Sequence, residues 1–138
     1  MNQLELTVAE KLRLFDSLVG YALNYNASVW GYHEAKHIEQ VQCNFLRRML
    51  KVKQSTNVYG LYGDVGRYPM KIARELILIK YWLKLLNSNN KLIVNIYRMI
   101  CDDANDNTTY SGLNWAYHIK TLLQSIGLGN VWYEQRAN

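Results

Sequence analysis

Apolar residues recur at intervals of three and four along almost the whole chain, which is the spacing of one face of an α-helix. We find no segment with the strict alternation typical of a β-strand, and no internal repeat. Hydrophobic residues make up 49% of the 138 residues and charged residues 20%, which excludes the disordered class and provides enough side chains for a core. We therefore predict an all-α fold, a single compact bundle of about five to seven helices formed by residues 1–138.

Local signals place the first two helices. Thr7 and Glu10 have the spacing of a capping box, which begins a helix whose apolar pattern continues to Trp30 and is ended by Gly31. Gly20, inside this run, marks a weak point or a close packing contact. A second helix is expected over about residues 35–52. Its apolar stripe comprises Ile38, Val41, Phe45, Met49 and Val52, with Leu46 on the flank, and Arg47 and Lys51 fall on the opposite, outward side.

The remaining helices follow from the same signals. Pro69 suits the first turn of a helix over 69–87, which carries two apolar stripes and is therefore expected at the centre of the bundle. One stripe comprises Ile72, Leu76, Ile79, Leu83 and Leu86, and the other Leu78, Tyr81, Trp82 and Leu85. Gly127 suits a left-handed helix cap. Shorter helices are expected around 57–62, 90–101, 112–126 and 131–135, the last docking Trp132, with a polar loop over 102–111.

Positive charge is concentrated in the middle third of the chain. The formal net charge is +5, but residues 41–84 hold nine basic residues against only Asp64 and Glu75, so this segment carries a net +7. Such a segment attracts polyanions, nucleic acid first and an anionic membrane second. The alternative is a solvated, lysine-rich surface. The candidate phosphate contacts are Arg47, Arg48, Lys51, Lys53, Arg67, Lys71, Arg74, Lys80 and Lys84.

Three tyrosines of this basic segment lie near Arg67 and Lys71 in the sequence. Tyr59, Tyr62 and Tyr68 lie in the glycine-containing connection before Pro69. Aromatic rings interleaved with cations are typical of grooves that follow a nucleic-acid backbone, because the rings stack on bases. The alternative is that these rings fill the core beneath a long connection.

The patterns that could carry catalysis are incomplete. The pair Asp102–Asp103 ends a helix without the β-hairpin of a metal-dependent polymerase site, so we interpret it as solvated acids. His33 and His37 have a zinc-chelating spacing but no third ligand at a suitable position. The glycines of residues 60–66 follow no strand and precede no Gly-Lys-Ser/Thr, as a phosphate loop would. We expect no catalytic site, metal, cofactor or small-molecule substrate.

Cysteine content and hydropathy indicate the compartment. Cys43 and Cys101 are too few for a disulfide framework, and we expect reduced thiols in the cytoplasm or nucleus. No run of about 20 apolar residues exists, so no membrane span is predicted. The N-terminal segment lacks the apolar centre of a secretion signal.

Three blocks of the sequence, in order, together resemble the C-terminal part of reverse transcriptases of non-LTR retrotransposons. The first is KLRLFDSLV at residues 11–19, continued by SVWG at 28–31. The second is FLRRMLKVKQST at 45–56. The third is LYGDVGRYPM at 61–70, continued by IKYWLKL at 79–85.

This resemblance implies a helical region downstream of the polymerase palm, in the position of a thumb that grips the primer–template backbone. The catalytic aspartates of such an enzyme belong to the palm, upstream of these blocks, so this region is not expected to polymerise by itself. Gly20, Tyr21 and Asn26 depart from the Ser-Pro and Gly usual in the family, which suggests a diverged copy.

The sequence thus leaves two main hypotheses. The first is a catalytically inactive fragment or remnant of a retrotransposon RNA-directed DNA polymerase that binds RNA–DNA or DNA duplex backbone without base specificity. The second is a helical protein-interaction or structural module with no nucleic-acid role. A small thiol or metal enzyme is a third and weaker reading.

Overall fold

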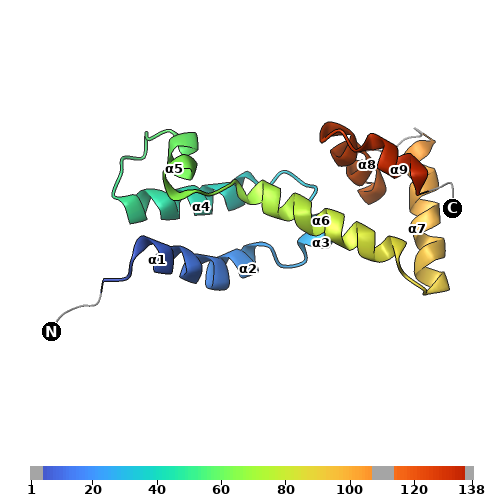
Figure 1. Ribbon diagram of the computed structural model, residues 1–138, viewed down its shortest axis with the longest axis horizontal. Coiled ribbons are helices and arrows are strands. Elements are labelled where there is room, and N and C mark those ends of the chain that lie inside the picture. The colour runs from blue at the N-terminus through green and yellow to red at the C-terminus, as the bar shows by residue number, and fades with distance from the viewer. Residues whose placement is uncertain (1–4, 107–113, 136–138) are drawn as a thin grey trace.

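A computed structural model describes residues 5–106 and 114–135 (Figure 1). These residues form helices and no strand, which confirms the all-α prediction. There are more helical segments than the five to seven expected, because the first predicted helix is divided. In chain order the elements are α1 (Val8–Leu14), the π-helical segment η1 (Phe15–Gly20), α2 (Tyr21–Leu23), α3 (Ala27–Trp30), α4 (Lys36–Leu50), α5 (Val58–Val65), α6 (Met70–Leu86), α7 (Lys91–Asn105), α8 (Trp115–Ser125) and α9 (Gly129–Glu134).

The first predicted helix starts as expected and then changes geometry. The Thr7 hydroxyl accepts a hydrogen bond from the Glu10 amide at 3.3 Å, and the Glu10 carboxylate accepts one from the Thr7 amide at 2.7 Å. Six residues then take π-helical form, ending at the buried Gly20. Asn26 adopts a left-handed conformation with φ of 53°, which separates α2 from α3. Gly31 ends α3 as predicted, where a β-carbon would lie 2.3 Å from the Ala27 carbonyl oxygen.

Helix α4 is slightly shorter than predicted and buries a different face. Leu46, expected on the flank, is fully buried, whereas Val41 and Val52 of the predicted stripe are exposed. Lys51 has a φ of 54° and ends the helix, and the Val52 amide bonds back to the Arg47 carbonyl at 3.1 Å. This left-handed cap turns the chain away, so Val52 cannot continue the helical face. The first core cluster of the fold contains Cys43, Leu46, Leu61 and Tyr62.

The central position predicted for α6 is correct, but its two-sided burial is not. The helix contacts α3, α4, α7 and α8, and in Figure 1 it joins the end formed by α4 and α5 to the end formed by α7, α8 and α9. Its buried residues occur at every fourth position: Met70, Arg74, Leu78 and Trp82. The predicted stripe through Ile72, Leu76, Leu83 and Leu86 is largely exposed. The helix therefore buries one stripe, and an arginine belongs to it.

The C-terminal helices enclose the second core cluster. Leu78 and Trp82 of α6 pack here with buried residues of α7, α8 and α9, including Cys101, Ala116, Ile119, Leu123 and Trp132. Trp132 docks as predicted, stacked on Trp82 with ring centroids 6.2 Å apart. Gly127 has the predicted left-handed conformation with φ of 80°, and the Leu128 amide bonds back to the Leu123 carbonyl at 2.8 Å.

Helix α7 is longer than predicted. Helix α7 continues to Asn105, so the first part of the loop predicted over 102–111 is helical, while residues 107–111 of that prediction lie outside the described residues.

Cys43 and Cys101 are both buried, in different core clusters, and neither forms a disulfide. Among the described residues, no helix combines the length and apolar content needed to cross a bilayer.

Candidate nucleic-acid interface

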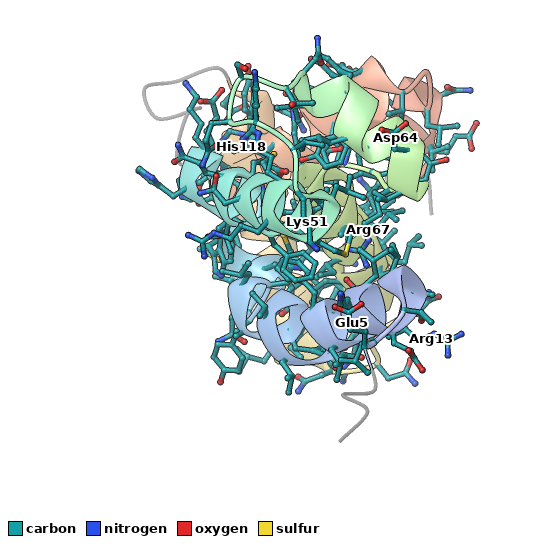
Figure 2. All side chains as sticks on the ribbon, turned by 90° about the vertical axis from the view of Figure 1, so that its left-hand side faces the viewer. Glu5, Arg13, Lys51, Asp64, Arg67 and His118 are labelled. Carbon is teal, nitrogen blue, oxygen red and sulfur yellow. The ribbon has the colours of Figure 1, made fainter. Side chains whose placement is uncertain are left out.

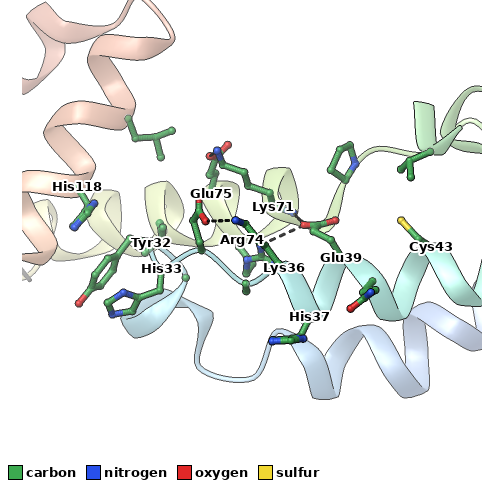
Figure 3. A pocket seen from close by; sticks show the side chains of 18 of the residues that line it. Tyr32, His33, Lys36, His37, Glu39, Cys43, Lys71, Arg74, Glu75 and His118 are labelled. Carbon is green, nitrogen blue, oxygen red and sulfur yellow. Dashed lines mark hydrogen bonds and ion pairs between the residues drawn. The ribbon is translucent and has the colours of Figure 1, made fainter. Parts of the chain in front are cut away.

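Arg74 is not available for a phosphate contact. Its side chain is 2% exposed, and its Nη2 atom lies 3.3 Å from a Glu39 carboxylate oxygen of α4 (Figure 3). Glu39 also accepts hydrogen bonds from the backbone amides of Met70 at 2.9 Å and Lys71 at 2.5 Å. These are the first amides of α6, which have no partner inside their own helix. Glu39 therefore caps α6 from another helix and neutralises Arg74, which gives this arginine a structural role.

Arg67 is also held inside the fold. Its guanidinium pairs with Asp16 of η1, donates to the Leu12 carbonyl at 3.4 Å, and lies 6.0 Å from the centre of the Phe15 ring. The side chain is only 18% exposed. Arg67 thus fastens the α5–α6 connection to the N-terminal helix and is neutralised by an acid from outside the basic segment.

Arg47 faces inward, contrary to the prediction that it faces water or a partner. Its Nη2 atom donates to the Thr56 carbonyl at 3.2 Å, and the side chain is half-buried. This bond holds the connection between α4 and α5 against the end of α4. Arg47, like Arg67 and Arg74, is therefore occupied by the fold itself.

Three candidate cations form an exposed group at the C-terminal end of α4. Arg48, Lys51 and Lys53 are all exposed, and no ion pair joins them to an acid in the described part of the chain. We call these residues the α4-end cations. Figure 2 views the molecule from this end and labels Lys51 of this group, together with Arg13 of α1.

The other exposed candidates lie elsewhere. Lys71 lies 3.6 Å from Glu75, one turn further along α6. Lys80 and Lys84 are exposed and unpaired with any described acid, but they lie in the second half of α6, toward the end formed by α7 to α9 (Figure 1). The nine candidates therefore do not form one continuous surface. They divide into three internal arginines, the α4-end cations and three lysines along α6.

The tyrosines also divide between the two readings. Tyr62 is buried, its hydroxyl lies 3.4 Å from a Glu39 oxygen and 3.4 Å from the Cys43 sulfur, and burial raises its pKa. This residue belongs to the core, as the alternative reading held. Tyr59 and Tyr68 are 81% and 76% exposed, so their rings are accessible for stacking.

A large cleft brings together rings that the sequence did not connect. It has a volume of about 1050 Å³ and lies between α4, α6 and α8 (Figure 3). On one side the Tyr32 ring stacks against His118, with centroids 4.5 Å apart, and contacts His33 at a tilt, with centroids 4.1 Å apart. Three of its basic residues have a close acidic partner, because Lys36 lies 3.4 Å from Glu34, Lys71 pairs with Glu75 and Arg74 pairs with Glu39. Arg47 also lines the cleft and donates to the Thr56 carbonyl. Most of the positive charge of the cleft is therefore neutralised by its own acids.

The structure gives no support to a metal or paired-carboxylate site. Among residues 5–106 and 114–135, no group of three metal-ligating side chains converges, so the spacing of His33 and His37 leads to no such cluster. Asp102 and Asp103 are exposed on the last turn of α7, away from the α4-end cations.

Sequence reasoning missed three features of these sites. The Tyr32–His118 stack and the Glu39–Arg74 pair join residues that are far apart in sequence, so no local pattern could reveal them. The π-helical segment η1 is not predicted either, although the sequence indicates a weak point or a close packing contact at Gly20, where η1 ends. No family model, curated protein or solved structure matches the chain.

Proposed function

We propose that this chain binds the sugar–phosphate backbone of nucleic acids, without base specificity, through Arg48, Lys51 and Lys53. The observation that carries the proposal is the exposure of these three cations, all within residues 48–53 and without acidic partners among the described residues. Exposed lysine and arginine side chains without acidic partners contact phosphate at little cost in free energy, because they have no ion pair to break. Contacts of this kind fix position on a duplex and carry no base information.

We further propose that the chain derives from the thumb-like C-terminal region of a non-LTR retrotransposon reverse transcriptase. The support is the set of three ordered sequence blocks, one of which contains all the α4-end cations. Polymerase catalysis in that family belongs to the palm, so the proposed role is to hold RNA–DNA or DNA duplex and not to polymerise. The polyanion is therefore expected to be a duplex.

Binding measured at two salt concentrations tests the proposal. A labelled RNA–DNA hybrid and a DNA duplex are titrated with wild-type protein and with the variant R48Q/K51Q/K53Q, and fluorescence anisotropy is recorded at about 50 mM and about 200 mM salt. Each phosphate contact contributes about 0.9 to the slope of log K against log salt, so three lost contacts reduce it by about 2.7. Between the two salt concentrations, the wild-type affinity should fall about 40-fold further than the variant affinity.

The matched control is K80Q/K84Q, which also removes exposed lysines without ion pairs to described acids. It should leave most of the binding in place, because these lysines lie on another part of the surface. Wild-type binding that is absent at low salt or insensitive to salt contradicts the proposal. Equal binding by wild type and R48Q/K51Q/K53Q, with both folded by circular dichroism, favours the interaction module instead.

A further inference from the structure

A groove separates the N-terminal helix from α4. It has a volume of about 560 Å³ and its apolar lining comprises Leu14, Phe15, Leu18, Val19, Val41 and Phe45. At its floor the rings of Phe15 and Phe45 stack, with centroids 4.4 Å apart. The groove therefore has walls from two helices and a fixed aromatic floor.

Its upper walls leave large apolar side chains in water. Leu18 is 70% exposed, Leu14 is 45% exposed and Val41 is 40% exposed. Single exposed apolar residues are common on protein surfaces, but these three line one concave site, where a partner could cover them together.

One wall has an uncommon backbone geometry. Phe15, Leu18 and Val19 all belong to η1, a π-helical segment of six residues. π-Helical turns are rare in proteins and occur frequently at functional sites. The unusual geometry thus coincides with the exposed apolar lining.

The polar residues of the groove are basic or neutral. Lys11 of α1 and Arg48 of α4 line it from opposite walls, and the remaining polar lining residue is Asn44. No carboxylate is present in this lining. A partner that fills the groove therefore gains from negative charge on both sides of its apolar stripe.

We propose that this groove docks an amphipathic helix of another protein, with an apolar stripe bordered on both sides by glutamate or aspartate. A helix fits because its side chains at every third and fourth position would enter a groove formed by two other helices. This surface is separate from the proposed duplex contacts except at Arg48, which both use. Lys11 and Leu18 belong to the groove alone, so they distinguish the two activities.

The test uses two labelled synthetic helices of about 18 residues with the same leucine stripe. In one peptide the stripe is bordered by glutamates, and in the other by lysines. Titration of the full chain, followed by anisotropy, should show binding of the glutamate peptide and at least about tenfold weaker binding of the lysine peptide. L18Q should lower the affinity for the glutamate peptide at least about tenfold. K11E should lower the affinity for the glutamate peptide and raise the affinity for the lysine peptide. V29Q is the control, because Val29 is 62% exposed and does not line this groove.

Several results would overturn the proposal. They are no binding of the glutamate peptide at about 1 mM, equal binding of both peptides, or no effect of L18Q in a folded variant. Sedimentation that shows a wild-type dimer abolished by L18Q assigns the groove to a second copy instead. A loss of duplex affinity in K11E, with peptide binding unchanged, assigns the groove to nucleic acid.

Discussion

Glu39→Gln isolates the charge that holds α4 and α6 together. The Glu39 carboxylate accepts hydrogen bonds from Arg74, from the Met70 and Lys71 amides, and from the Tyr62 hydroxyl. Glutamine keeps the shape and one acceptor oxygen but removes the negative charge opposite Arg74, which is 2% exposed. Within the described residues, Nε and Nη1 of Arg74 have no hydrogen-bond partner, so Glu39 provides its main electrostatic compensation.

The expected loss follows from the burial of the two partners. Removing one partner of a buried ion pair costs about 3–5 kcal/mol, because the other charge stays buried and uncompensated. Glu39 is itself 26% exposed, so water reaches the site and reduces the cost to about 2–3 kcal/mol. With a urea m-value of about 2 kcal/mol/M, the unfolding midpoint should fall by about 1–1.5 M.

Urea unfolding followed by circular dichroism measures this loss. Glu75→Gln is the matched control, because Glu75 forms a pair with the largely exposed Lys71 and its loss should cost under about 0.5 kcal/mol. Arg74→Met and the double variant complete a cycle, in which the double loss should be at least about 1 kcal/mol smaller than the sum of the single losses. A Glu39→Gln variant as stable as Glu75→Gln, or additive losses, would refute a neutralised structural role for Arg74.

Three further predictions follow from the backbone and from burial. Gly66→Ala should lower the unfolding free energy by about 1 kcal/mol, because Gly66 has a φ of +62°. Gly63→Ala, inside α5, should raise the unfolding free energy by about 0.5–1 kcal/mol. Both sites have open space around a β-carbon, so equal effects of the two substitutions in urea unfolding would contradict the reasoning. Lys51→Gly should raise the unfolding free energy by about 0.5–1 kcal/mol, because glycine adopts the left-handed cap conformation without strain. The same substitution should weaken duplex binding measured by anisotropy. A higher melting temperature with unchanged or tighter duplex binding would argue against a phosphate contact by Lys51. Burial raises the pKa of Tyr97, so the stability that its neutral phenol contributes is full below the unfolded pKa near 10 and is lost as the pH rises further. The melting temperature should therefore fall less in Tyr97→Phe than in wild type between about pH 9 and about pH 11. An identical fall in both proteins would exclude this contribution.

Helix ends were predictable because they depend on neighbours in the sequence. Thr7 and Glu10 form their capping box within a single turn, and Gly127 takes its left-handed conformation at the end of α8. Trp132, in the short last helix, docks in the core as predicted. In each case the deciding contacts lie within a few residues or follow from the large apolar area of one side chain.

The faces of the helices and the fate of the basic residues were decided by tertiary structure. Arg74 occupies a buried position of α6 because Glu39 comes from another helix, 35 residues away, to neutralise it. Arg67 is likewise paired with Asp16, 51 residues away. Both acids lie outside residues 41–84, so counting charge in that segment overstated the number of exposed cations. Sequence specifies interactions within a helical turn, whereas burial and ion pairing depend on which distant elements pack together.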